Sequence, residues 1–181
     1  CIRIIEAGAD LVRLTAQGVK EAENLANIKR KLRKSGFETP LIADIHFNPA
    51  AAETAARIVE KVRINPGNYI DKRASFIKTI LTEKEYEEEL ERIHERLLPL
   101  IKICRENKTV IRVGINHGSL SDRIMTRYGN TPEGMVQSAL EFTRIFRAEN
   151  FADLVLSMKS SDTIVLLESN RLLVNRMREE G

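Results

Sequence analysis

Short β-prone runs alternate with longer segments of helical period, and this alternation limits the possible fold more than any other feature of the chain. The segments between the runs repeat apolar residues at intervals of three and four, as one stripe of an amphipathic helix does. Strands that alternate with helices pair in parallel, because each helix returns the chain to the starting edge of the sheet. The sequence therefore predicts an α/β protein with a parallel sheet, whose strands are expected at residues 10–14, 40–46, 62–65, 110–116 and 153–158.

Composition excludes several classes of protein. The 181 residues, 43% hydrophobic and 30% charged, suffice for one sizeable core. No apolar run approaches the roughly 18 to 20 residues of a membrane span, and a net charge of +3 does not indicate nucleic-acid binding. Cys1 and Cys104 supply neither a disulfide framework nor a CxxC metal spacing. We therefore expect a cytoplasmic protein that binds neither a membrane nor nucleic acid.

Two architectures satisfy the alternation, the doubly wound dinucleotide-binding sheet and the (β/α)₈ barrel. No GxGxxG motif follows the first predicted strand, which removes the main sign of a dinucleotide fold. The strands carry polar residues at alternate positions, whereas a doubly wound sheet is apolar on both faces. A barrel has helices only outside and places its chemistry at the carboxyl ends of the strands. We expect residues 1–181 to form one incomplete TIM-barrel domain, with about five of the eight βα units.

The alternate polar positions of the strands supply a set of candidate ligand-binding residues, all of which can point into one shared interior. Several converging cations beside a single aspartate repel one another, and a polyanionic ligand would relieve that repulsion. The planar fork of arginine suits phosphate oxygens. The alternative is that each arginine merely pairs with an acidic residue. The candidates are Arg13, Asp44, His46, Arg63, Asn65, Arg112, Asn116 and Lys159.

A metal site is a weaker interpretation of the same strands. Asp44 and His46 stand two residues apart, and a carboxylate with an imidazole suits zinc or iron. A third ligand is missing, because His94 lies on a charged helix and His117 is the one remaining candidate. We therefore predict no metal ligands in this chain.

Five motifs follow one another along nearly the whole chain. They are Ala-Asp-Ile-His-Phe at 43–47, Arg-Ile-Asn-Pro-Gly-Asn at 63–68, Arg-Val-Gly-Ile-Asn-His-Gly-Ser-Leu at 112–120, Ser-Met-Lys-Ser-Ser-Asp at 157–162 and Glu-Ser-Asn-Arg-Leu-Leu at 168–173. In this order they resemble the 4-hydroxy-3-methylbut-2-enyl-diphosphate synthase family, in its longer form of plants and some bacteria. The chain is similar to part of that family's N-terminal barrel domain, so we expect a piece of a longer protein.

The resemblance implies an oxidoreductase of non-mevalonate (MEP pathway) isoprenoid biosynthesis. The parent enzyme would reductively open 2-C-methyl-D-erythritol 2,4-cyclodiphosphate to 4-hydroxy-3-methylbut-2-enyl diphosphate. Electrons would come from ferredoxin or flavodoxin through a [4Fe–4S] cluster in a C-terminal domain, and a homodimer is possible in this family. The family's cluster cysteines have no match here, so neither that domain nor the extra domain of the longer form is expected in this chain. The chain alone is therefore expected to hold no catalytic residue and to be inactive.

The resemblance also implies a role for each candidate residue. The cations would grip the substrate's diphosphate: Arg13, Arg63, Arg112 and Lys159. The other candidates would orient the diphosphate oxygens and the substrate hydroxyls: Asp44, His46, Asn65 and Asn116. Two long loops, at residues 69–83 and 116–131, carry further cations that could close over the substrate, unless these loops are ordinary surface segments. These cations are Lys72, Arg73, Lys78, Arg123 and Arg127.

Two other functions remain open at this point. One is a barrel enzyme of the dihydropteroate synthase type, with Asp44 and Asn65 on a pterin. The other is a non-catalytic module that recognises a phosphorylated partner or RNA. Only 5% of the residues are aromatic, so the chain lacks the stacking platform of a single-strand binder.

Overall fold

The fold is known from a computed structural model, which describes residues 1–45, 47–69 and 81–180. One parallel sheet has the strand order β1-β2-β3-β4-β5, the same as the order along the chain. A doubly wound sheet reverses its strand order at a switch point, whereas successive barrel strands lie side by side. The predicted fold class is therefore confirmed as an α/β fold with part of a TIM barrel. The strands are β1 Val12–Ala16, β2 Leu41–Ile45, β3 Lys61–Ile64, β4 Val110–Asn116 and β5 Leu154–Lys159.

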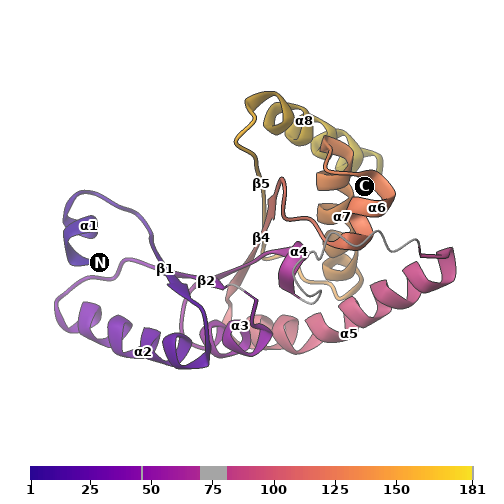
Figure 1. Cartoon of the computed structure of the whole chain (residues 1–181). Coiled ribbons are helices and arrows are strands. Elements are labelled where there is room, and N and C mark those ends of the chain that lie inside the picture. The colour runs from indigo at the N-terminus through magenta and orange to yellow at the C-terminus, as the bar shows by residue number, and fades with distance from the viewer. Residues whose placement is uncertain (46, 70–80, 181) are drawn as a thin grey trace.

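The helices cover one face of this sheet. Figure 1 shows α2, α3 and α5 followed by α7 and α8 around one side of the strands. Contacts join α2 to β1, α3 to β2 and β3, α7 to β4, and α8 to β5. No helix of the described residues is both long and apolar enough to cross a bilayer. The helices are α1 Ile2–Glu6, α2 Val19–Lys34, α3 Pro49–Ala56, α4 Pro66–Tyr69, α5 Glu83–Asn107, α6 Asp122–Tyr128, α7 Pro132–Ala148 and α8 Thr163–Glu180.

The core lies between the helices and the outer face of the sheet. On β4 the alternate residues Ile111, Val113 and Ile115 are all buried in it. Because neighbouring side chains of a strand point to opposite faces, Arg112, Gly114 and Asn116 lie on the inner face. The alternation of apolar and polar residues therefore separates a packed outer layer from an inner layer that is free to carry polar groups.

Local signals explain where α3, α5 and α7 begin. Thr82 and Glu85 form a reciprocal capping box at the start of α5. Asn48 caps α3 by accepting a hydrogen bond from the backbone of Ala51, and a proline follows this cap. Thr131 caps α7 in the same way, again with a proline at the first turn. These caps satisfy backbone N–H groups that have no partner inside the helix.

Two sequence-based boundaries were wrong. The first strand was expected at residues 10–14, but β1 pairs with β2 from Val12 to Ala16. Pairing begins where Val12 aligns with Leu41, the residue after Pro40. It ends where Ala16 aligns with Ile45, so β1 ends two residues later than expected. The loop expected at residues 116–131 contains the helix α6. Ser121 caps α6, and Leu120 and Ile124 anchor its start in the core.

A buried polar cluster joins α5, α6 and α7. Arg123 donates to Oε1 of Glu141 at 2.6 Å, and the hydroxyl of Tyr86 donates to the same oxygen. The guanidinium of Arg123 lies 4.8 Å from the centre of the Tyr86 ring, and that of Arg127 lies 4.5 Å from it. Arg127 also pairs with Glu83 at 3.0 Å. Arg123 and Arg127 therefore bind helices of the scaffold, which corrects the expectation that they close over a ligand. The other three cations of that hypothesis, Lys72, Arg73 and Lys78, lie outside the described residues.

Replacing Glu141 by glutamine is expected to lower the free energy of unfolding by about 2 kcal/mol, because Arg123 then keeps a buried charge without its carboxylate. Urea unfolding followed by circular dichroism measures the change. The control is Glu88→Gln, which removes an exposed partner of Lys84 on α5 and is expected to cost less than about 0.5 kcal/mol. Equal effects of the two substitutions would contradict the assignment.

Candidate functional site

The strand register places the described candidate residues that lie within strands on the inner face of the sheet. Arg63 is aligned with Asp44 on one side and with Arg112 on the other. Asn116, four residues after Arg112 on β4 and nearer the carboxyl edge, is aligned with Lys159. Arg13 lies on β1 two residues before Thr15, the residue that is aligned with Asp44. His46 lies outside the described residues.

Asp44 is the carboxylate around which the inner-face cations gather. Its Oδ1 accepts a hydrogen bond from Nη1 of Arg63 at 3.1 Å. Its Oδ2 lies 3.6 Å from Nε of Arg13. The Arg63 residue is 1% exposed and Asp44 is 6% exposed, whereas half of the Arg13 side chain is exposed. Pairing with an acid, which was the alternative to ligand binding, is thus realised for Arg63 and partly for Arg13.

A glycine on the next strand makes room for Arg63. Nη2 of Arg63 donates to the carbonyl oxygen of Gly114 at 2.9 Å. A Cβ atom at Gly114 would lie 2.5 Å from Nε of Arg63, closer than any side chain tolerates. Both terminal nitrogens of Arg63 are therefore engaged with the protein, and the bare backbone of β4 is what allows this contact.

Arg112 is held by a residue to which the sequence analysis assigned no role. Its Nε donates to Oγ of Ser157 at 3.1 Å across the β4–β5 pair. Ser157 stands two residues before Lys159 on the same face of β5. The alternation rule that selected Lys159 selects Ser157 equally, so the signal was present in the sequence.

The pKa of Lys159 depends on the charges of the neighbouring strands. Burial lowers the pKa of Lys159, and the positive charges of Arg63 and Arg112 lower it further. Arg13 acts in the same direction more weakly, and the carboxylate of Asp44 opposes it. The cations from different strands therefore act on one another through space, as charges in a shared interior do.

Asn65 serves the scaffold rather than the open interior. Its Oδ1 accepts from the backbone N–H of Gly67 at 3.1 Å, and its Nδ2 donates to Oγ of Ser119 at 3.2 Å. The residue is 3% exposed. Gly67 in turn packs so tightly that a Cβ atom there would lie 1.9 Å from the carbonyl oxygen of Ser119. Asn65 thus ties the end of β3 to the loop after β4, while Asn116 at the end of β4 stays only half-buried.

The chain's own residues do not fit an iron–sulfur cluster. Cys1 is exposed before α1, and Cys104 is buried within α5 among apolar side chains. Burial raises the pKa of the Cys104 thiol to about 12, so it stays protonated at neutral pH. Among the described residues, no three His, Cys, Asp or Glu side chains come together as metal ligands do. His117 makes a 3.1 Å contact with the carbonyl oxygen of Asn130.

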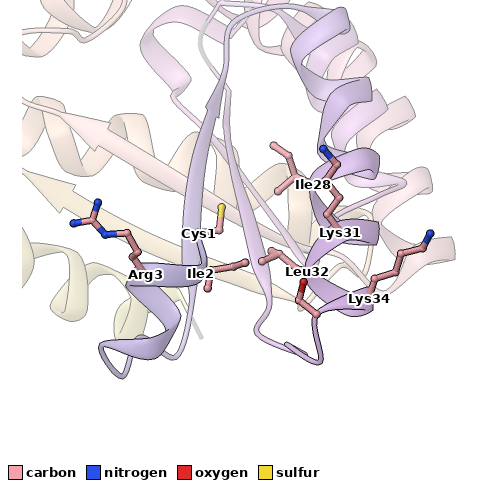
Figure 2. Close-up of a pocket in the computed structure, with 8 residues that line it drawn as sticks. Cys1, Ile2, Arg3, Ile28, Lys31, Leu32 and Lys34 are labelled. Carbon is pink, nitrogen blue, oxygen red and sulfur yellow. The ribbon is translucent and has the colours of Figure 1, made fainter.

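A cavity of about 650 Å³ lies away from the inner-face residues, between α1 and α2. Figure 2 shows Ile2 and Leu32 facing this space, while the charged ends of Arg3 and Lys34 point away from it. None of the candidate cations lines it. Its apolar lining does not suit an anion, so the inner face of the sheet remains the candidate functional site.

Comparisons with known proteins agree on one family. The GcpE TIM-barrel domain matches residues 1–180. The chain is 58% identical over 179 residues to the 4-hydroxy-3-methylbut-2-en-1-yl diphosphate synthase (flavodoxin) of Bacteroides thetaiotaomicron, covering 99% of this chain and 29% of that protein. Proteins of the same name from Parabacteroides distasonis and Akkermansia muciniphila are 58% and 51% identical over 180 residues, again over 99% of this chain. The chain covers 30% and 31% of those two relatives, so it spans about three tenths of their length.

Replacing Gly114 by alanine is expected to lower the free energy of unfolding by about 2 kcal/mol, because the new methyl group displaces the Arg63 guanidinium from Asp44. Thermal unfolding measures this loss. The control is Gly18→Ala, where the added Cβ meets only the flexible end of Glu21 and the φ angle of −142° suits any residue. That control is expected to cost below about 1 kcal/mol. An unchanged melting temperature in Gly114→Ala would show that Arg63 needs no glycine opposite it.

Proposed function

The chain belongs to the family of the GcpE TIM-barrel domain, and on that premise we propose that it is the diphosphate-binding part of a 4-hydroxy-3-methylbut-2-en-1-yl diphosphate synthase of MEP-pathway isoprenoid biosynthesis. Its ligand is 2-C-methyl-D-erythritol 2,4-cyclodiphosphate. One observation carries the proposal: within the described residues, the carboxylate of Asp44 lies on the inner face among a set of cations that act on one another, namely Arg13, Arg63, Arg112 and Lys159. A diphosphate supplies the negative charge that this face lacks.

The four cations have different roles in this proposal. Arg63 is buried and has both terminal nitrogens engaged, so it supports Asp44 and the β4 backbone. Arg13, Arg112 and Lys159 are the cations that solvent reaches. Arg112 binds two phosphate oxygens with its planar fork, and Lys159 adds a compact charge at the carboxyl end of β5.

The neutral and acidic groups then orient the rest of the ligand. Asn116 lies beside Lys159 at the carboxyl edge, where its half-buried amide binds a substrate hydroxyl. Asp44, which pairs with Arg63 and Arg13, accepts a hydrogen bond from a second hydroxyl. Asn65 acts through Ser119 and holds the loop that follows β4. The chain thus binds and orients, and the reducing centre belongs to other parts of the full-length protein.

The wider setting follows from the family. The relatives' names specify flavodoxin, so we infer that a flavodoxin supplies electrons to the full-length protein through its [4Fe–4S] cluster, in the cytoplasm. Residues 1–181 form one incomplete barrel domain in this proposal, and the homodimer stays a prediction. A pterin-binding function would need Asn65 to face the ligand, but both ends of its amide are bonded within the protein. Neither that function nor a non-catalytic module gains support.

Replacing Arg112 by alanine in the full-length protein, purified without oxygen, is expected to weaken pyrophosphate binding by roughly tenfold to a hundredfold, because a charge-assisted pair of hydrogen bonds is lost. Titration calorimetry measures the affinity, and consumption of the cyclic diphosphate with a strong reductant measures the activity. The matched control is Arg92→Ala, which removes an equally charged side chain from the outer helix α5. Wild-type affinity in Arg112→Ala would refute the proposed anion site.

The affinity for pyrophosphate is expected to fall as the pH rises, and to begin falling at a lower pH than it would if Lys159 had the usual pKa of a lysine. The pKa of Lys159 is lowered by burial and by Arg63 and Arg112, so its ammonium loses the proton at a lower pH than usual. Lys159→Arg keeps its charge throughout this range and should lack the decline. The ratio of wild-type to variant affinity, measured from pH 7 upward, cancels the titration of pyrophosphate itself. A ratio that does not change with pH would contradict the role of Lys159.

A further inference from the structure

Arg63 and Arg112, the aligned arginines of β3 and β4, each contact a small residue nearer the carboxyl edge of the sheet. Gly114 on β4 and Ser157 on β5 are register partners on the inner face. Each lies two residues nearer the carboxyl edge than the aligned pair Arg112 and Val155. Arg63 reaches the Gly114 carbonyl and Arg112 reaches the Ser157 hydroxyl, so both guanidinium groups extend toward the carboxyl edge.

The two arginines are held by different nitrogens. Arg63 uses Nη1 and Nη2 on Asp44 and Gly114, and its buried Nε has no hydrogen-bond partner. Arg112 uses Nε on Ser157, and its two terminal nitrogens donate to no other residue of the described part of the chain. A guanidinium held through Nε presents its terminal pair as a fork, the geometry that binds two oxygens of one phosphate.

The contact through Ser157 also removes rotational freedom from a long side chain. A half-buried arginine without a partner samples several rotamers, and binding a ligand must then restrict them at a cost in entropy. The hydrogen bond of 3.1 Å to Oγ already restricts the last torsions of Arg112 before any ligand arrives. The serine hydroxyl accepts this bond because arginine has no acceptor to offer in return.

We propose that Ser157 is a positioning residue for diphosphate binding, which acts by holding Nε of Arg112 so that the terminal nitrogens of that arginine face the ligand. This inference rests on the proposed function and adds to it a residue that selects which arginine binds and which one supports the scaffold. Ser157 itself bonds to Arg112 and not to the phosphate.

The test is a double-mutant cycle in the full-length protein, with pyrophosphate as the probe. Ser157→Ala is expected to weaken binding by roughly tenfold, since a hydrogen bond to a charged group is lost. In an Arg112→Ala background, the same change should alter the affinity by less than twofold. A serine that touches the phosphate directly would weaken binding in both backgrounds, and that result would overturn the inference.

Two further variants separate positioning from damage to the fold. Ser157→Thr keeps the hydroxyl and should restore most of the affinity, because threonine is well suited to a strand. Ser35→Ala removes an exposed serine after α2 and should bind as the wild type does. In the reductive assay, Ser157→Ala should raise KM for the cyclic diphosphate about tenfold and leave kcat within twofold. A fall in kcat with unchanged KM would contradict a role in binding.

The same measurements distinguish failure of this inference from failure of the proposed function. If the wild-type protein bound neither pyrophosphate nor the cyclic diphosphate, the proposed function would fall and this inference with it. If the wild type bound both and Ser157→Ala bound them equally well, the function would stand and the role of Ser157 would be refuted.

Discussion

The buried contact between Arg63 and Asp44 is the interaction on which the inner face depends. Removing two charges from water is costly, and a further hydrogen bond from Nη2 of Arg63 to the Gly114 carbonyl supports the contact. Such a pair adds little stability compared with apolar packing, but breaking it leaves a buried charge. Its role is to hold the Asp44 carboxylate at the centre of the face, where it also pairs with the more exposed Arg13.

Around that pair, the sheet separates two kinds of chemistry by strand parity. The outer residues of β4 are Ile111, Val113 and Ile115, and they pack under the helices. The inner residues of the same strand include Arg112 and Asn116, which a doubly wound sheet would have to bury under a second layer of helices. Sequential strand order with helices on one side leaves the inner face for polar side chains, and this is why a barrel can carry several cations from different strands.

The sequence predicted that all eight candidate residues bind the ligand, but the described ones differ in burial and in their partners in the structure. Arg63 and Asn65 are buried and bonded within the protein, whereas Arg112, Asn116 and Lys159 are partly open. Arg123 and Arg127, which the loops made plausible as mobile cations, bind Tyr86, Glu83 and Glu141 instead. The residues that sequence reasoning passed over are small ones, Gly114 and Ser157, because their effect comes from the neighbours they admit or hold.

The sequence by itself determined the fold class, the family, the bounds of β4 and the face of the strand on which each polar residue stands. These properties follow from periodicity and motif order, which are local to the chain. Only the tertiary structure decided which arginine is buried, which carboxylate it meets and that α6 interrupts an expected loop. Those outcomes depend on strand register and on contacts such as that of Arg63 with Gly114, 51 residues apart, whose energy no local pattern of the chain encodes.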